Sequence, residues 1–311
     1  MLSFLLRRLM QTVPILVAVA GLIFVLFSVI PGSFESSLMD DGKSMIDEQT
    51  VQRIRKELGL DQPVAVRFVR YVGSLATLDL GTSFRTRQPV TTVIAERLWP
   101  TLKLALAATL FAVVLGIPLG FLAAMRPGTL IDSASMVVAV SGLSLPKFWL
   151  GLLLMYLFAL TLGWLPSFGY GNGGISHLIL PAIALGVSPL GLLARTTRAA
   201  VLDIMNADFV RTARSKGMSE VRVVRWHLAR NALVIVLTTV GLQFGSVIGQ
   251  AVVVEKLFAW PGLGSLLVDS VSLRDIPVVQ GCILTLVLFF LVVNLVVDVL
   301  AALVDPRIRY T

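Results

Sequence analysis

Long apolar stretches separated by short polar segments dominate the chain. A helix needs about 20 apolar residues to cross a bilayer, and six stretches suit this task. The fourth is the shortest, and Pro181 and Pro189 leave its ends undefined. The six stretches cover approximately residues 9–30, 98–125, 134–162, 179–193, 233–254 and 278–304. The pattern predicts an all-α polytopic membrane protein with six transmembrane helices.

The composition agrees with this class. Hydrophobic residues make up 56% of the 311 positions and charged residues only 14%, against about 25% charged residues in a typical soluble domain. The net charge of +8 does not call for a nucleic-acid partner, because orienting the loops of a membrane protein explains it. The single cysteine, Cys282, excludes an internal disulfide and a cysteine-based metal site. His177 and His227 fall on opposite predicted membrane faces, which disfavours a metal site built from both.

Basic residues orient the predicted helices. Six spans place both termini on one side, and short loops rich in Lys and Arg stay cytoplasmic. The short loops on the other side hold only Lys256 and Arg274. The loop between the fourth and fifth stretches is strongly basic, with Arg195, Arg198, Arg211, Arg214, Lys216, Arg222, Arg225 and Arg230. Both termini and this loop are therefore predicted to be cytoplasmic.

The first apolar stretch follows Arg7 and Arg8, much as a secretory signal peptide begins. It is longer than the apolar region of roughly 7–15 residues in such a peptide, so we interpret it as an uncleaved helix. Residues 31–97 then form a large external loop, in which residues 50–58 have helical character and Gly59 suits a helix end.

Polar residues and glycines lie on different faces of the fifth predicted helix. Glycine recurs at every fourth position, at Gly241, Gly245 and Gly249, which allows another helix to approach closely. Two amides and a hydroxyl share a face about 130° away, namely Gln243, Ser246 and Gln250. Either this second face lines a wet path, or its side chains only bond to neighbouring helices.

The segment Asp208-Phe-Val-Arg-Thr-Ala-Arg-Ser-Lys-Gly217 is too polar to lie in lipid. Arg211 and Arg214, three residues apart, share one face of the helix expected there. Gly217 tolerates a positive φ angle and so permits a turn directly after that helix.

No catalytic motif accompanies these segments. The chain has no GxxxxGK[ST] loop for a nucleotide, and no HExxH, CxxC or GxSxG pattern. The carboxylates Glu255, Asp269 and Asp275 follow the fifth helix, where a solvated loop is the favoured interpretation over an acid–base pair.

Short motifs along the whole chain resemble the permeases of ABC importers, specifically the B-type subunit of the dipeptide, oligopeptide, glutathione and nickel importer family. The order and spacing of the motifs together make the resemblance specific. They include Leu58-Gly-Leu-Asp-Gln-Pro63, Asp79-Leu-Gly-Thr-Ser83, Gly163-Trp-Leu-Pro166, Arg195-Thr-Thr-Arg-Ala199, Gly241-Leu-Gln-Phe-Gly245, Val254-Glu255, Phe258-Ala-Trp-Pro-Gly-Leu-Gly264, Asn294-Leu-Val-Val-Asp298 and Asp305-Pro-Arg-Ile308.

The resemblance implies a type I ABC importer permease fold in a bacterial inner membrane. Its expected parts are a cytoplasmic N-terminus with helix 1 (residues 1–30), a periplasmic loop (31–97), a permease domain with helices 2–6 (94–304) and a cytoplasmic C-terminus (305–311). Within the permease domain, residues 195–231 approximately would form the coupling loop, whose short helix falls within Asp208–Gly217. Thr212, Ala213 and Gly217 would make the fit to a partner, while the arginines orient the loop.

The resemblance also implies partners. This chain would pair with a homologous second permease and with two ABC ATPases, which bind ATP and magnesium, so the chain itself needs no cofactor and is not an enzyme. A periplasmic or lipid-anchored binding protein would deliver small peptides. A nickel or other chelated-solute importer is the alternative within the family. An ion-coupled secondary transporter would show inverted repeats and more ionisable groups at the midplane, and a membrane-embedded enzyme would show paired catalytic groups.

Lys147 is the most costly residue inside a predicted span. It lies about 20 Å into the third stretch, where a central lysine costs on the order of 2.5–3.5 kcal/mol. Pro146, directly before it, is expected to break or kink the helix. Lys147 then either lines the path and attracts the carboxylate of a passing peptide, or extends to the outer interface.

Overall fold

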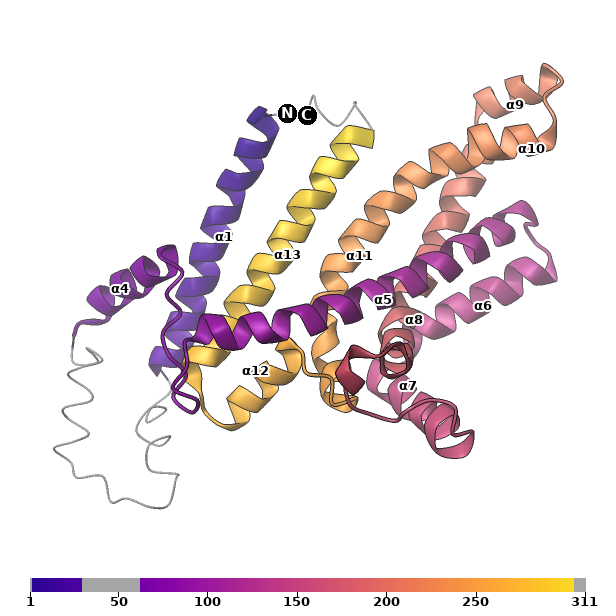
Figure 1. The fold of residues 1–311 in the computed structure, drawn as a ribbon. Coiled ribbons are helices and arrows are strands. Elements are labelled where there is room, and N and C mark those ends of the chain that lie inside the picture. Colours follow the sequence, from indigo (N-terminus) through magenta and orange to yellow (C-terminus); the bar gives the residue numbers. More distant parts are fainter. Residues whose placement is uncertain (1, 30–61, 305–311) are drawn as a thin grey trace. The chain divides into compact units, whose positions relative to one another are not determined.

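The computed structural model describes residues 2–29 and 62–304, which form helices and one isolated bridge between Thr82 and Pro89. Figure 1 shows and labels these helices. The α-helices are α1 (Leu2–Val29), α4 (Val64–Ala76), α5 (Val90–Met125), α6 (Leu130–Ser144), α7 (Lys147–Leu154), α8 (Ile175–Met205), α9 (Asp208–Ser215), α10 (Glu220–Val223), α11 (Arg230–Leu257), α12 (Leu263–Ser272) and α13 (Ile276–Val304). The helix expected at residues 50–58 lies outside the described residues.

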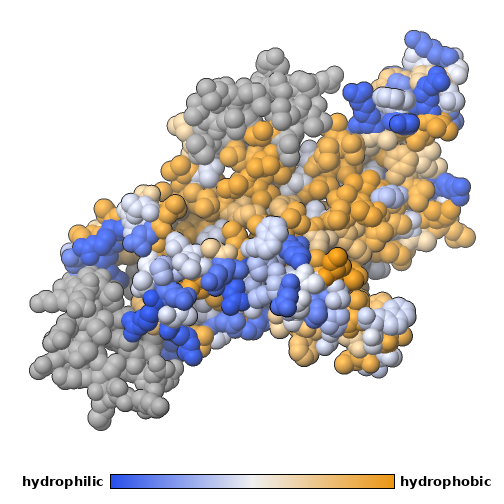
Figure 2. All heavy atoms as spheres, in the orientation of Figure 1, coloured by the Kyte–Doolittle hydropathy of each residue, from blue (hydrophilic) through white to orange (hydrophobic). Residues whose placement is uncertain are grey.

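The predicted spans are present as apolar helices. In the part of the chain that the structure describes, five helical segments are long and apolar enough to cross a membrane: Met10–Phe27, Val90–Met125, Ile175–Met205, Glu220–Leu257 and Ile276–Val299. A sixth is complete if α6 and the segment that begins with α7 are counted as one broken span. Figure 2 shows hydrophobic residues over the long helices and hydrophilic residues gathered where α9 and α10 lie. The all-α, polytopic expectation is confirmed.

The third span is broken where Pro146 predicted it. α6 and the following helix, which continues α7 as a π-helical segment (Met155–Thr161), meet at an angle of 107°. Leu145 has extended backbone angles, as expected for a residue before proline. Pro146 is the N-cap of the next helix, α7, where its missing N–H removes no hydrogen bond within the helix.

The fourth span is much longer than its apolar stretch indicates. α8 runs continuously through Pro181 and Pro189, and its middle is largely buried between α6 and α11. Its glycines permit close packing: a β-carbon on Gly191 would lie 2.1 Å from the carbonyl oxygen of Ala139, and one on Gly186 would lie 2.6 Å from that of Ala108. α8 is therefore a central helix of its part of the chain.

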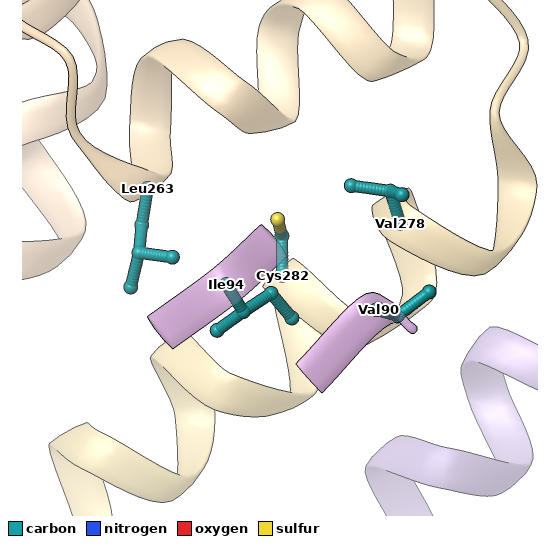
Figure 3. Packing of buried hydrophobic residues seen from close by; sticks show 5 residues of the cluster. All are labelled: Val90, Ile94, Leu263, Val278 and Cys282. Atoms are coloured by element: carbon teal, nitrogen blue, oxygen red, sulfur yellow. The ribbon is translucent and has the colours of Figure 1, made fainter. Parts of the chain in front are cut away.

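The described chain divides into two compact units, with boundaries inside α5 and α13. One contains residues 100–261 and the end of α13 from Phe289; the other contains residues 2–29, 62–99 and 262–288. Figure 3 shows an apolar cluster of the second unit, formed by Val90, Ile94, Leu263, Val278 and Cys282.

In the second unit, α4 packs against α1 through aromatic side chains. The rings of Phe24 and Phe68 meet edge to face, with centroids 5.4 Å apart. The ring of Tyr71 also contacts that of Phe24. The hydroxyl of Tyr71 is buried without a hydrogen-bond partner, and this burial raises the pKa of Tyr71 to about 12.

The interpretation of the acidic residues after the fifth helix as solvated is wrong for two of them. Glu255 is fully buried and accepts a hydrogen bond of 2.6 Å from the hydroxyl of Thr101. Asp275, in the other unit, is also buried and accepts a 2.5 Å bond from the hydroxyl of Ser83. Burial requires such partners, because an unpaired buried carboxylate is costly. Only Asp269 is exposed.

Candidate functional site

The polar segment after α8 folds into a short amphipathic helix, α9. Val210 and Ala213 are its buried residues, and they pack with Val223 and Leu228 of the following helix. The ends of two further helices complete this cluster, with Met125 from α5 and Ile204 and Met205 from α8. α9 is thus held on the ends of three spanning helices.

The end of α9 follows from its sequence. The amide of Gly217 donates to the carbonyl of Arg214, and the amide of Met218 donates to the carbonyl of Ala213. This pair of bonds is the Schellman motif, which needs a left-handed residue directly after the helix. Gly217 has φ +77°, so the turn expected at this glycine is confirmed.

The other side of α9 is open. Exposed side chains on the helix and its end are Asp208, Phe209, Arg211, Thr212, Arg214, Ser215 and Lys216. Arg214 is nevertheless engaged, because its Nε lies 2.8 Å from the carboxylate of Glu220. Arg211 has no ion-pair partner among the described residues. Of the residues expected to fit a partner, Thr212 is exposed, whereas the side chain of Ala213 faces the chain's own core.

A second polar contact ties α6 to α8 near the same end. The Arg198 guanidinium donates to both carboxylate oxygens of Asp132, at 2.6 and 2.7 Å. The amide of Gly128 also donates to this carboxylate, and the hydroxyl of Thr129 caps α6 by accepting from the Asp132 amide. Sequence reasoning assigned no role to Asp132, although its place as an acid at the start of an apolar stretch was an available signal.

Lys147 and two residues of the polar face of α11 form one hydrogen-bonded chain. The Lys147 ammonium donates to the side-chain carbonyl of Gln250, and the Gln250 amide donates to the hydroxyl of Ser246. The bend after α6 brings Lys147 to α11. Gln243 lies two turns from Gln250, half-buried and outside this chain of bonds.

The three glycines of α11 have different surroundings. A β-carbon on Gly241 would lie 2.3 Å from a methyl of Val297, and one on Gly245 would lie 3.1 Å from Phe290. Both neighbours belong to α13, so these two glycines face that helix. Gly249 has nothing within 4 Å of the corresponding position.

Within residues 2–29 and 62–304, no group of three or more His, Cys, Asp or Glu side chains is placed to hold a metal ion. Lys103 lies well inside α5, which begins at Val90, and its ammonium donates to the carbonyl of Gly173.

Comparison with known families identifies the class of protein. Residues 116–310 match the model of the binding-protein-dependent transport system inner membrane component, and residues 1–105 match that of the N-terminal part of such membrane components. The chain therefore belongs to this family, the permeases of ABC importers. Membership disfavours the secondary-transporter and membrane-enzyme alternatives.

Individual members of this family are similar to the chain over its whole length. The chain is 44% identical over 310 residues to the glutathione transport system permease protein GsiC of Salmonella paratyphi A, covering all of both chains. It is 45% identical over 316 residues to a putative peptide transport system permease protein of Brucella abortus, again covering all of both chains.

Solved structures agree on the fold. A chain of the MetNI methionine ABC transporter in an inward-facing conformation matches with TM-score 0.59 and 20% identity, covering 68% of this chain and 96% of that chain. A chain of an amino acid ABC transporter matches with TM-score 0.52 and 21% identity, covering 70% of this chain and 94% of that chain. The fold is that of type I ABC importer permeases, as the sequence predicted.

Proposed function

We propose that this chain is the permease subunit through which an ATP-driven importer moves small peptides, glutathione among them, across a bacterial inner membrane. The names of the full-length relatives support the substrate class. The observation that carries the proposal is the packing of α9, an amphipathic helix with a polar outer face. Its apolar face packs against the ends of α5 and α8 and against the helical segment that leads into α11.

α9 is the proposed coupling helix. A docked ATPase that moves when it binds ATP would shift α9, and the shared apolar cluster would carry that shift to three spanning helices at once. ATP and magnesium would be held by two partner ATPases, and the described residues of this chain need only supply the docking surface within Asp208–Gly217. A homologous second permease and an external binding protein complete the assembly, with α9 and both termini cytoplasmic.

The proposed path runs past Lys147, Gln250 and Ser246, with Gln243 further along α11. Lys147 carries a positive charge, and its partner in this chain, the Gln250 amide, is neutral. A charged group beside a neutral amide keeps its attraction for an anion, so Lys147 can draw in the carboxylate of a peptide. Gly241 and Gly245 would hold α11 close to α13 beside this path, and Gly249 would leave room next to Gln250.

The docking proposal is tested by substituting Thr212→Trp on the exposed face of α9. The larger side chain leaves the buried face of α9 intact, so the permease should still be recovered from membranes. A tagged wild-type chain should co-purify with a second permease and P-loop ATPases, whereas T212W should lose the ATPases and ATP-driven uptake.

The matched control is Thr86→Trp, the same change at an exposed position on the opposite predicted side. T86W should retain the ATPases. Recovery of ATPases with T212W at the wild-type level would refute docking at α9, and absence of ATPases from the wild-type preparation would refute the importer proposal itself.

The path proposal is tested by Lys147→Met and Lys147→Arg. Loss of the charge should lower the rate of peptide uptake about tenfold, roughly the effect of one charge-assisted contact of 1.5 kcal/mol, while K147R should retain most of the rate. Binding of peptide to the soluble binding protein serves as the control, because neither substitution touches that protein. Unchanged uptake kinetics in K147M would restrict Lys147 to a structural role.

A further inference from the structure

The helix that leads from α10 into α11 carries a face that no other described element covers. Its members are Val221, Arg222, Arg225 and Trp226, called here the arginine–tryptophan face. Val221 is 77% exposed and Trp226 is 56% exposed. The opposite side of the same helix holds Val223 and Leu228, which are fully buried against α9.

The face carries uncompensated positive charge. Among the described residues neither Arg222 nor Arg225 has a carboxylate partner, whereas Arg214 nearby is paired with Glu220. The guanidinium carbon of Arg225 lies 5.9 Å from the centre of the Trp226 ring, a cation–π contact. Such a contact orders the arginine while leaving its hydrogen-bond donors available for an anion.

Helix length places this face beside the membrane surface. The continuous helical segment Glu220–Leu257 has 38 residues, or about 57 Å, whereas the hydrocarbon core is about 30 Å thick. The apolar part of the segment starts after Arg230, and Trp226 precedes Arg230 by about 6 Å along the helix axis. Trp226 and Arg225, within about 8 Å of Arg230, therefore fall near the depth of the lipid headgroups, and Arg222, about 12 Å from Arg230, lies farther from the apolar part.

The arginine–tryptophan face is a different surface from the proposed ATPase-docking surface. α9 lies along one side of α10 (Figure 1), and Val223 and Leu228 point to it. The arginine–tryptophan face is on the side of the helix away from α9. The proposed docking surface, the outer face of α9, is directed away from this helix.

We propose that the arginine–tryptophan face binds the phosphate groups of anionic phospholipids in the cytoplasmic leaflet. Tryptophan settles at the headgroup level of a bilayer, and basic residues next to a spanning helix attract anionic lipid. Arg225 and, through its long side chain, Arg222 supply the phosphate contacts, and Trp226 enters the boundary with the acyl chains. The lipid contact would hold the base of α11 in place while α9 moves. The proposal rests on the proposed function only for the cytoplasmic orientation.

The test measures which lipid touches Trp226. The importer containing the full-length chain is purified and placed in two kinds of phosphatidylcholine nanodisc. One contains a small fraction of brominated phosphatidylglycerol, and the other contains the same fraction of brominated phosphatidylcholine. Bromine quenches nearby tryptophan, and subtracting the signal of Trp226→Phe isolates this one ring. Brominated phosphatidylglycerol should be enriched at the ring over brominated phosphatidylcholine by about fivefold for each arginine.

Variants decide between the possible outcomes. The double substitution Arg222→Gln and Arg225→Gln should abolish the preference, leaving equal quenching by both lipids. Arg211→Gln, an exposed arginine on the far side of α9, is the matched control and should leave the preference unchanged. Equal quenching by the two lipids in the wild-type chain would overturn the proposal, and so would the absence of quenching by either lipid, which would mean that a protein covers the face.

The outcome is independent of ATPase docking. Lipid preference at Trp226 together with missing ATPases would refute the proposed function and retain the lipid site. Co-purifying ATPases together with a Trp226 that no lipid quenches would support the proposed function and refute the lipid site.

Discussion

α9 and the turn that follows α11 contain similar residues, but the two regions differ in whether charged side chains are exposed or buried. Both are short, carry charged and aromatic side chains, and connect to long apolar helices. In α9 the apolar residues Val210 and Ala213 point into the chain and the charges point out. At the end of α11, directly before the turn, the carboxylate of Glu255 points into the chain and is fully buried.

The turn after α11 is built like the interior of a soluble protein. The indole of Trp260 is buried, donates a 2.9 Å hydrogen bond to the carbonyl of Pro100, and stacks edge to face on Tyr170. The carbonyl of Phe258 accepts from the amide of Gly169. Each polar group on this list has its partner inside the chain, so the turn is a fixed structure. The polar side chains of α9 are exposed, as the docking surface proposed there requires.

The largest expected effect follows from removing the buried carboxylate. Glu255→Ala leaves the Thr101 hydroxyl without its acceptor and creates a cavity, at a cost of about 2–4 kcal/mol in unfolding free energy. Glu220→Ala removes the exposed carboxylate that pairs with Arg214, and should cost under about 1 kcal/mol. Thermal unfolding of both purified variants in the same detergent gives the comparison. Equal shifts in the midpoint temperature would contradict the contrast between the two regions.

The same contrast explains what the sequence predicts well. Local patterns indicated the apolar helices, the break at Pro146 and the turn at Gly217, because each depends on neighbouring residues along the chain. The burial of Glu255 depends on Thr101, 154 positions earlier, and the Asp132 contact depends on Arg198, 66 positions later. Charge alone suggests solvent for such residues, and only the packed helices reveal the partner.

The length of α8 was underestimated for a related reason. An apolar stretch marks the part of a helix suited to lipid, whereas α8 continues as a helix through Arg195 and Arg198 to Met205. Its two prolines are tolerated within a packed helix, as happens where neighbouring helices and side chains satisfy the freed backbone groups. Helix ends that protrude from the lipid therefore require the structure.

An effect of intermediate size is expected when the packing of the buried face of α9 is weakened and its exposed face is left unchanged. Val210→Ser places a hydroxyl in the apolar cluster and removes methyl groups, at a cost of about 2 kcal/mol. Because α9 is attached mainly through this cluster, its amides should exchange with solvent deuterium faster, and ATP-driven uptake should fall with them. Hydrogen exchange with mass spectrometry measures the first effect. Thr212→Ala, on the exposed face, should leave α9 protection within about 0.5 kcal/mol of wild type; equal loss in both variants would deny that the buried face fixes the helix.

The smallest effect concerns the turn that ends α9. Gly217→Ala puts a β-carbon on a residue with φ +77°, where the space around it is open, so the cost is the left-handed conformation itself, about 1 kcal/mol. The last turn of α9 should fray, which would show as faster exchange at Lys216, Gly217 and Met218 with little change in uptake. Gly73→Ala is the matched control, because Gly73 lies in the helix α4 with open space around it, and alanine there should stabilise by about 0.5–1 kcal/mol. If G217A and G73A changed stability in the same direction, the Schellman turn would not be what ends α9 in solution.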